Sequence, residues 1–169
     1  DRQRRGFEIQ TLFQWPMHNG EPDVRTSTLA GPEGPLLHLD YGSSTRLSRI
    51  NKGLRRRKSK AICGFFIDPN SGRWIKDPDN GEDDEGMADP TTAKAQRIVP
   101  MVEDHKNALL MRPETPLSTE QMATLQHALI RGIQLVFELE EGEILGEPLP
   151  TKDIRNAVLL YEATEGGAG

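Results

Sequence analysis

The sequence has one cysteine, few aromatic residues and no long apolar run, and each shortage excludes a class of protein. With Cys63 alone, the chain cannot form an internal disulfide or supply a cysteine cluster for zinc, which suits a reducing cytoplasm. Aromatic residues make up 5% of the sequence and charged residues 28%, so we expect a modest core and a heavily solvated surface. No stretch reaches the roughly 18 apolar residues that a membrane-spanning helix needs. We therefore expect a cytoplasmic protein without a membrane partner.

The net charge of −5 hides a strong separation of charge along the chain. One segment is basic and contains no acid: Arg46, Arg49, Lys52, Arg55, Arg56, Arg57, Lys58 and Lys60. A second segment is acidic and contains no base: Asp77, Asp79, Glu82, Asp83, Asp84, Glu85 and Asp89. Clustered Arg and Lys neutralise phosphates and release counterions, which predicts binding to a nucleic-acid backbone. The alternative, which the sequence leaves open, is that these cations pair with the acidic segment or with an acidic protein partner.

Apolar runs bounded by turn residues predict a chain that is rich in strands. The clearest signal is a hairpin over residues 62–76, in which Asp-Pro-Asn-Ser-Gly separates two apolar runs and Gly72 takes the left-handed position. Residues 77–90 are expected to form a solvated loop. The other expected strands are residues 7–15, 36–42, 45–54, two runs within 98–113, 143–149 and 156–163.

One long helix is expected over residues 119–139. Ser118 and Gln121 have the spacing of a capping box. Apolar residues then recur at intervals of three and four, which predicts a buried stripe with Gln134 outside it. The stripe consists of Met122, Leu125, Leu129, Ile133, Val136 and Phe137. The sequence thus predicts an α+β fold, with a strand-rich mixed sheet and one long amphipathic helix packed across it.

Patterns for catalysis or metal binding are weak. Glu103, Asp104 and His105 form the only compact group of acids and imidazole, expected in a loop, and they support a hydrolase only as a minor alternative. The acidic segment lacks the glycine that a calcium loop needs at its sixth position, where Glu82 stands. His127 is expected to pack partly buried beside the helix stripe, and Cys63 to pack as a small apolar residue. We therefore predict no catalytic residue and no metal ligand in this chain.

The glycines near the end of the sequence, Gly166, Gly167 and Gly169, raise the possibility of a phosphate-binding loop. A Walker loop would need Lys and Ser or Thr after its glycines, and a dinucleotide fingerprint would need a following helix. The sequence has neither after these glycines. We therefore interpret them as a structural turn after a strand.

Three stretches together resemble a known family: RINKGLRRRKSKAICGFFIDPNSGRW, TLQHALIRGIQLVFELEEGEILGEPLP and VLLYEATEGGAG. They are similar to the C-terminal accessory domain of bacterial DEAD/DEAH-type helicases related to MrfA and of DISARM-like anti-phage defence proteins. The resemblance covers residues 41–169, with residues 1–40 as an N-terminal strand and loop segment. In that family the glycine turn leads towards a four-cysteine zinc cluster. The resemblance thus implies an interior piece of a longer protein, with zinc possible downstream of Gly169.

The resemblance implies a division of labour, in which a separate ATP-dependent motor performs helicase work and this region supplies a non-catalytic surface. The eight cations from Arg46 to Lys60 are then expected to contact DNA phosphates and to position DNA without reading its sequence. The region would also dock on the motor or on a subunit of a defence complex. The alternative is a protein–protein interaction module of such a complex that does not touch DNA.

Overall fold

The computed structural model describes residues 6–77 and 95–164 and shows a fold built mainly of β-strands. Strands make up 54% of the described residues and helix makes up 13%, and these residues contain a single α-helix. The predicted α+β class, with a mixed sheet and one long helix packed across it, is therefore wrong. The apolar runs were identified correctly, but two pairs of expected strands merge into the longer strands Gly34–Leu54 and Met101–Pro113. Residues 144–150 pair with 155–162, 155–162 with 101–113, and 25–31 with 34–54, in each case antiparallel.

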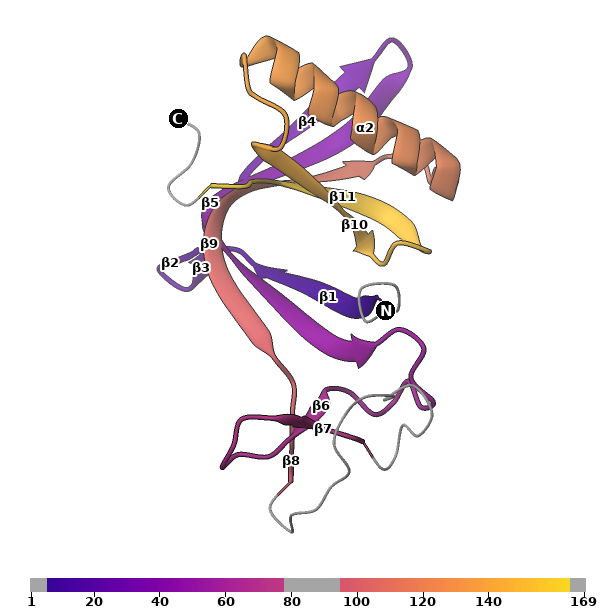
Figure 1. The fold of residues 1–169 in the computed structure, drawn as a ribbon. Coiled ribbons are helices and arrows are strands. Elements are labelled where there is room, and N and C mark those ends of the chain that lie inside the picture. Colours follow the sequence, from indigo (N-terminus) through magenta and orange to yellow (C-terminus); the bar gives the residue numbers. More distant parts are fainter. Residues whose placement is uncertain (1–5, 78–94, 165–169) are drawn as a thin grey trace. The chain divides into compact units, whose positions relative to one another are not determined.

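Six strands form the main sheet, in which the order β1-β5-β9-β11-β10 is extended by β4 paired to β5 (Figure 1). A two-stranded sheet pairs β2 with β3, and a three-stranded sheet has the order β7-β6-β8. The bounds are β1 Phe7–Gln14, β2 Met17–His18, β3 Glu21–Pro22, β4 Arg25–Gly31, β5 Gly34–Leu54, β6 Phe65–Ile67, β7 Trp74–Ile75, β8 Gln96–Ile98, β9 Met101–Pro113, β10 Ile144–Pro150 and β11 Arg155–Glu162.

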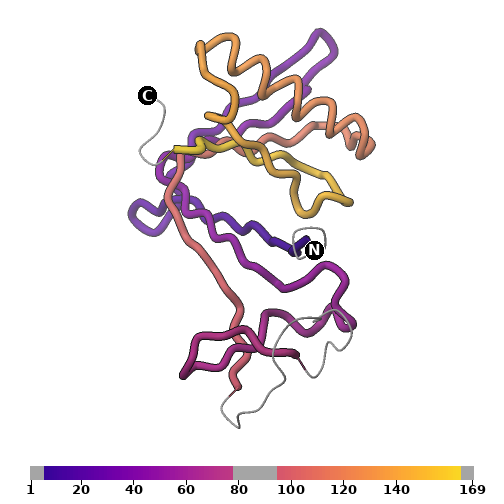
Figure 2. The backbone as a smooth tube through the Cα atoms, in the orientation of Figure 1, coloured from indigo at the N-terminus to yellow at the C-terminus, as the bar shows by residue number. Residues whose placement is uncertain are grey.

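The chain divides into two compact units, and the strands β1, β5 and β9 contribute residues to both. The long strands β5 and β9 can be followed along the backbone in Figure 2. The first unit comprises residues 1–12 and 48–102, and the second comprises residues 13–47 and 103–169. The strands β5 and β9 each begin in one unit and end in the other. These units group the residues differently from the segments 1–40 and 41–169, which stay a prediction about domain organisation.

Two expected breaks between strands do not occur. The segments 36–42 and 45–54 join into β5, where Ser44 has a φ of 55° and Thr45 is buried. Residues 103–106 were expected to interrupt the strand but lie within β9. At the first of these places the Ser44 N–H donates to the side-chain oxygen of Asn107 on β9, so a polar side chain satisfies the backbone there. The hairpin, β10 and β11 are confirmed close to their expected bounds.

The helix α2, Thr119–Val136, packs in the second unit against β10 and β11 (Figure 1). The predicted capping box is confirmed, because Ser118 Oγ accepts from the Gln121 N–H while the Gln121 side chain accepts from the Ser118 N–H. Met122 lies fully buried with Met111, Val158 and Leu160, and Leu125, Leu129 and Ile133 pack around them. These residues form the larger apolar cluster of the second unit.

The prediction of which residues are buried at the C-terminal end of the helix is wrong. Val136 and Phe137 are 75% and 68% exposed, whereas Gln134, expected outside the stripe, is buried. Gln134 hydrogen-bonds Arg131 and the Glu140 carbonyl, and these partners satisfy the amide at the C-terminal end of the helix. Gln126 is buried for a similar reason, since its amide donates to the Gly146 carbonyl on β10 at 3.0 Å. A Cβ at Gly146 would stand 3.0 Å from that amide nitrogen, so glycine permits the approach.

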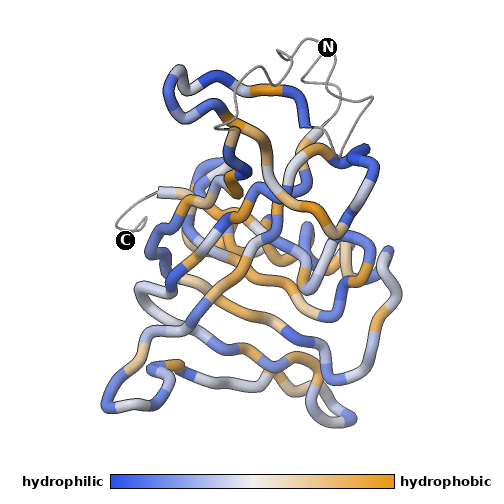
Figure 3. The backbone as a smooth tube through the Cα atoms, turned by 90° about the horizontal axis from the view of Figure 1, so that it is seen from below, coloured by the Kyte–Doolittle hydropathy of each residue, from blue (hydrophilic) through white to orange (hydrophobic). Residues whose placement is uncertain are grey.

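Apolar and polar residues alternate in short stretches along the described chain (Figure 3). Half-buried strands have this pattern, because successive side chains point to opposite faces of a sheet. Among the described residues no helix has the length and apolar character needed to cross a membrane.

Candidate nucleic-acid interface

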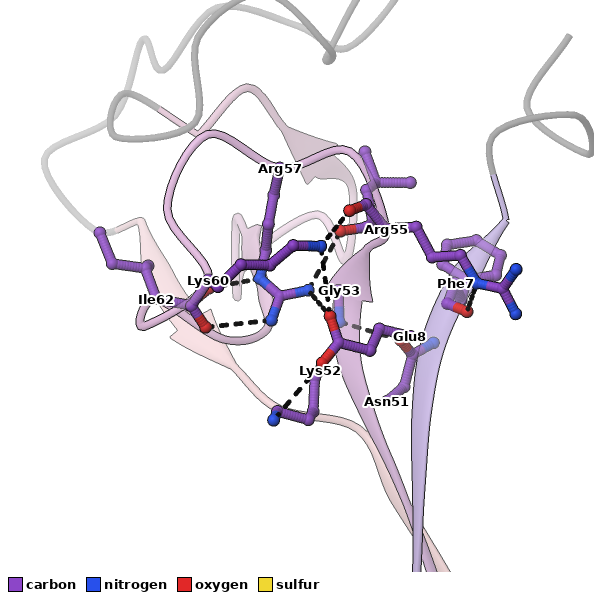
Figure 4. A network of polar contacts seen from close by, with 10 residues as sticks. Phe7, Glu8, Asn51, Lys52, Gly53, Arg55, Arg57, Lys60 and Ile62 are labelled. Carbon is purple, nitrogen blue, oxygen red and sulfur yellow. Dashed lines mark hydrogen bonds and ion pairs between the residues drawn. The ribbon is translucent and has the colours of Figure 1, made fainter. Parts of the chain in front are cut away.

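A single carboxylate, Glu8 on β1, contacts three of the eight cations predicted to bind phosphate (Figure 4). Glu8 lies 2.7 Å from Arg57 Nη1 and 3.5 Å from both Lys52 Nζ and Lys60 Nζ. All four residues belong to the first unit. Glu8 was missed at the sequence level because it lies in a strand distant in sequence from the basic segment. The available signal was that Glu8 is the one charged residue in β1, a strand in which apolar and polar residues alternate.

Arg57 is the centre of this network and is enclosed by it. Its side chain is only 1% exposed, and it donates to the carbonyls of Leu54, Lys60 and Ile62 as well as to Glu8 (Figure 4). An arginine has five N–H donors, so most of its donors are used inside the protein. Arg57 holds the 54–62 turn closed, and its guanidinium is buried in this conformation. The phosphate contact expected of Arg57 stays a prediction.

Two glycines with positive φ, one on each side, allow the 54–62 turn to form. Gly53 has a φ of 114° and Gly64 a φ of 92°, values that disfavour residues with a Cβ. The Gly64 N–H donates to the Lys52 carbonyl, and a Cβ at Gly64 would lie 2.2 Å from the Ile98 carbonyl oxygen. The chain just after the basic segment therefore lies close against β8 at Gly64, and the Gly64–Lys52 hydrogen bond joins it back to the basic segment.

Three cations of the turn face outward: Arg55, Arg56 and Lys58. Arg55 Nε donates to the Phe7 carbonyl at 3.1 Å, which fixes its position beside β1 and leaves its terminal nitrogens exposed (Figure 4). The side chains of Arg56 and Lys58 make no hydrogen bond or ion pair within residues 6–77 and 95–164. Lys60 is also exposed, but it donates to the Arg55 carbonyl.

The remaining two cations lie further along β5. Arg46 is in the second unit, where it donates to Gln14 and lies 3.7 Å from Glu103. Arg49 is half-buried and already has a partner. The structure thus brings Lys52, Arg57 and Lys60 together on Glu8, and presents Arg55, Arg56 and Lys58 to solvent.

The electrostatics of the cluster favour an ionised Glu8. The hydrogen bond from Arg57 is the largest influence and lowers the pKa of Glu8 below 4.5, and burial opposes it. The charges of Arg57, Lys52 and Lys60 add to the lowering. Glu8 is therefore ionised at neutral pH, and it neutralises part of the basic segment without covering the outward-facing cations.

The acidic segment begins with a residue that is not solvated. Asp77, predicted to lie in an exposed loop, is buried and accepts two hydrogen bonds from Arg97, at 2.6 and 2.9 Å. The Arg97 guanidinium also lies 4.5 Å from the centroid of the Phe66 ring. The other acids, from Asp79 to Asp89, lie outside the described residues, and so does their predicted pairing with the basic segment.

Glu103, Asp104 and His105 do not converge. They are successive residues of β9, and strand geometry sends Asp104 to the face opposite its two neighbours. Asp104 pairs with Lys106 at 3.0 Å, and the hydrogen bond from Lys106 lowers the pKa of the Asp104 carboxyl. Nothing in this arrangement matches a nucleophile held by a base, so the structure adds no support to the hydrolase alternative.

The remaining residues singled out from the sequence are His127, Cys63 and the three glycines near its end. His127 is exposed on α2, so the expected partial burial is wrong. Cys63 is half-buried and unpaired in the turn region. Gly166, Gly167 and Gly169 lie outside the described residues, so their role as a structural turn stays a prediction.

Comparison with known proteins identifies the class of domain to which part of the chain is similar. A protein-family model described as the MrfA Zn-binding domain matches residues 125–169, which include most of α2 and the strands β10 and β11. This match supports the MrfA-like part of the predicted resemblance. No curated protein and no solved structure matches the chain.

The matched segment has few of the Cys and His residues that most often bind zinc. It has no cysteine, and its only histidine, His127, is exposed on the helix. No group of three or more His, Cys, Asp or Glu residues that could hold a metal ion occurs in the described part of the chain. Structural zinc requires four such ligands. What the segment supplies is a helix packed on an antiparallel strand pair.

Proposed function

We propose that the chain is a non-catalytic accessory domain of an MrfA-like, helicase-related protein, and that its basic turn contacts the phosphate backbone of DNA. The parent would be an ATP-dependent helicase of the cytoplasm, acting in anti-phage defence. The family match over residues 125–169 supports the MrfA-like class, and the basic turn supports the contact with DNA.

The observation that carries the proposal is the exposure of Arg55, Arg56 and Lys58 on a turn that is rigidly built. Glu8 forms ion pairs with Lys52, Arg57 and Lys60. It therefore does not neutralise the three exposed cations. Exposed cations on a turn that is held by its own contacts suit phosphate oxygens, because little loop entropy is lost when the complex forms. Contacts of this kind position DNA and carry no direct sequence information.

The test is fluorescence anisotropy on the full chain with labelled duplex and single-stranded DNA across a salt series. Affinity should fall steeply with salt, with a logarithmic slope of about 0.9 per neutralised phosphate on duplex and about 0.7 on single strands. The double variant Arg56→Ala/Lys58→Ala should weaken binding to unrelated sequences alike and reduce the slope on duplex by about 2.

The matched control is Arg25→Ala/Lys152→Ala, which removes two exposed cations from the second unit. It changes the net charge equally and should leave the affinity near that of the wild type. A flat salt response, or equal losses in both double variants, would contradict a defined phosphate contact in the basic turn.

The second candidate function, docking on a protein partner, is favoured by a separate observation in the second unit. Leu135, Val136 and Phe137 are 81%, 75% and 68% exposed at the end of α2. Contiguous exposed apolar side chains often mark interaction surfaces. Acids follow them in sequence, at Glu138, Glu140 and Glu141, so the complementary surface would be apolar with a basic rim. Replacing Phe137 with Asp should abolish capture of a purified motor domain and leave DNA binding intact.

A further inference from the structure

The first unit carries a row of aromatic rings beside the basic turn. The Phe65 ring makes edge-on contacts with Phe7, at a centroid distance of 5.9 Å, and with Trp74, at 5.1 Å. Phe65 is half-buried between the other two, whereas Phe7 and Trp74 are 44% and 41% exposed. In a protein with 5% aromatic residues, two exposed rings supported by a third form an unusual surface.

The register of the three-stranded sheet explains why these rings share one face. Phe65 and Ile67 are two residues apart on β6 and therefore point to the same side, and Ile67 lies opposite Trp74 on β7. The other side of the sheet contains Phe66, opposite the buried Ile75 and beneath the Arg97 guanidinium. One side is thus closed by packing and by the Arg97–Asp77 pair, and the other presents aromatic rings.

A cation lies at one end of the aromatic row. Arg55 Nε donates to the carbonyl of Phe7, so its guanidinium is held beside the first exposed ring (Figure 4). This positive charge disfavours a basic or purely apolar partner and favours an anionic one that also has flat apolar surfaces.

We propose that Phe7 and Trp74 form a stacking platform for the bases of single-stranded nucleic acid, with Arg55 contacting the adjoining phosphate. Every base has a π-face, so stacking tolerates any sequence. A duplex hides those faces within its own stack and meets only the cations. This inference rests on the proposed phosphate contact and makes it more specific by naming the single-stranded form as the preferred ligand.

The first test uses the two tryptophans of the chain, Trp15 and Trp74. Titrating the full chain with a thymidine oligonucleotide of about 20 nucleotides, longer than a typical binding site, should quench tryptophan fluorescence. Trp74→Phe should remove the quenching, because Trp15 packs in the second unit against Phe13 and the apolar cluster there. Quenching that persists in Trp74→Phe would overturn the assignment to Trp74. This variant retains a ring and should keep its affinity for the oligonucleotide within about threefold.

The second test is affinity. Trp74→Ala should weaken binding of the same oligonucleotide by about 5- to 150-fold, the range expected for loss of one stacked base. Its affinity for a duplex should change by less than about twofold. The control is Phe137→Ala, which removes an aromatic ring that is even more exposed, at 68%, from the second unit and should change neither affinity.

The outcomes separate this inference from the proposed function. If Arg56→Ala/Lys58→Ala weakens binding but Trp74→Ala does not, the phosphate contact stands and stacking is wrong. If Trp74→Ala weakens single-stranded and duplex binding equally, the platform does not select single strands, and the inference fails. If neither nucleic acid binds, but an apolar acidic peptide quenches Trp74, the face is a protein-docking surface and both proposals fall.

Discussion

Glu8 and Arg57 lie 49 positions apart in the sequence, yet their side chains meet at 2.7 Å in the first unit. The pair ties β1 to the turn after β5, and three backbone carbonyls complete the coordination of the guanidinium. An arginine with a side chain only 1% exposed is costly to bury unless its donors are satisfied. Arg57 therefore holds the basic turn closed, and its pairing with Glu8 ties that turn to β1.

Replacing Glu8 with Gln should destabilise the protein at neutral pH by about 1 to 3 kcal/mol, because the buried guanidinium loses its charged acceptor. Arg57 lowers the folded-state pKa of Glu8 below 4.5, so the stabilisation is present above the unfolded pKa and disappears as pH falls through the lowered folded value. Urea midpoints at neutral pH and at acid pH measure this difference between wild type and Glu8→Gln. A difference that grows towards acid pH would show that the sign of the linkage is wrong.

Two substitutions on opposite faces of α2 test which face of the helix packs into the core of the second unit. Met122→Ala should cost about 2 to 5 kcal/mol, as expected when a fully buried side chain is truncated. Leu135→Ala, at a position 81% exposed, should change the free energy of unfolding by less than about 0.5 kcal/mol. Chemical denaturation monitored by circular dichroism gives both values. Equal costs would contradict the helix orientation described above.

Local patterns in the sequence predicted the local elements well. The capping box at Ser118 and Gln121 and the turn at Gly72 depend only on residues close in sequence, and both are confirmed. The fold class was wrong because length and curvature of a strand depend on its partners. Thr45 is buried in the middle of β5, where its hydroxyl donates to the Gly42 carbonyl and permits the strand to continue through a polar stretch.

The sequence predicted the candidate interface only from the number of Arg and Lys residues clustered in one segment. Nothing in the basic segment distinguishes Arg56 from Arg57, yet the former is exposed and the latter is buried. The difference arises from Glu8 and from three carbonyls that the turn aligns, all of which are tertiary features. The aromatic row was missed for the same reason, because Phe7 belongs to a strand remote in sequence from Phe65 and Trp74.

The contrast between Arg56 and Arg57 gives a direct way to separate DNA contact from folding. Arg57→Ala should unfold or loosen the basic turn, because Glu8 and the carbonyls of Leu54, Lys60 and Ile62 lose their donor. We expect a loss of about 2 to 4 kcal/mol in the free energy of unfolding, in the range for breaking a buried charged network. Any loss of DNA affinity in this variant would follow from the altered turn.

Arg56→Ala should show the reverse pattern. Its exposed side chain makes no hydrogen bond or ion pair with another described residue, so the free energy of unfolding should stay within about 0.5 kcal/mol of the wild type. The duplex affinity should fall, and the logarithmic salt slope should decrease by about 1, because one phosphate contact is lost. Denaturation and salt-dependent anisotropy on the same two variants supply both readouts. If Arg56→Ala keeps the full salt slope while Arg57→Ala remains folded and loses it, the phosphate contact belongs to Arg57, and the enclosed guanidinium must open to reach DNA.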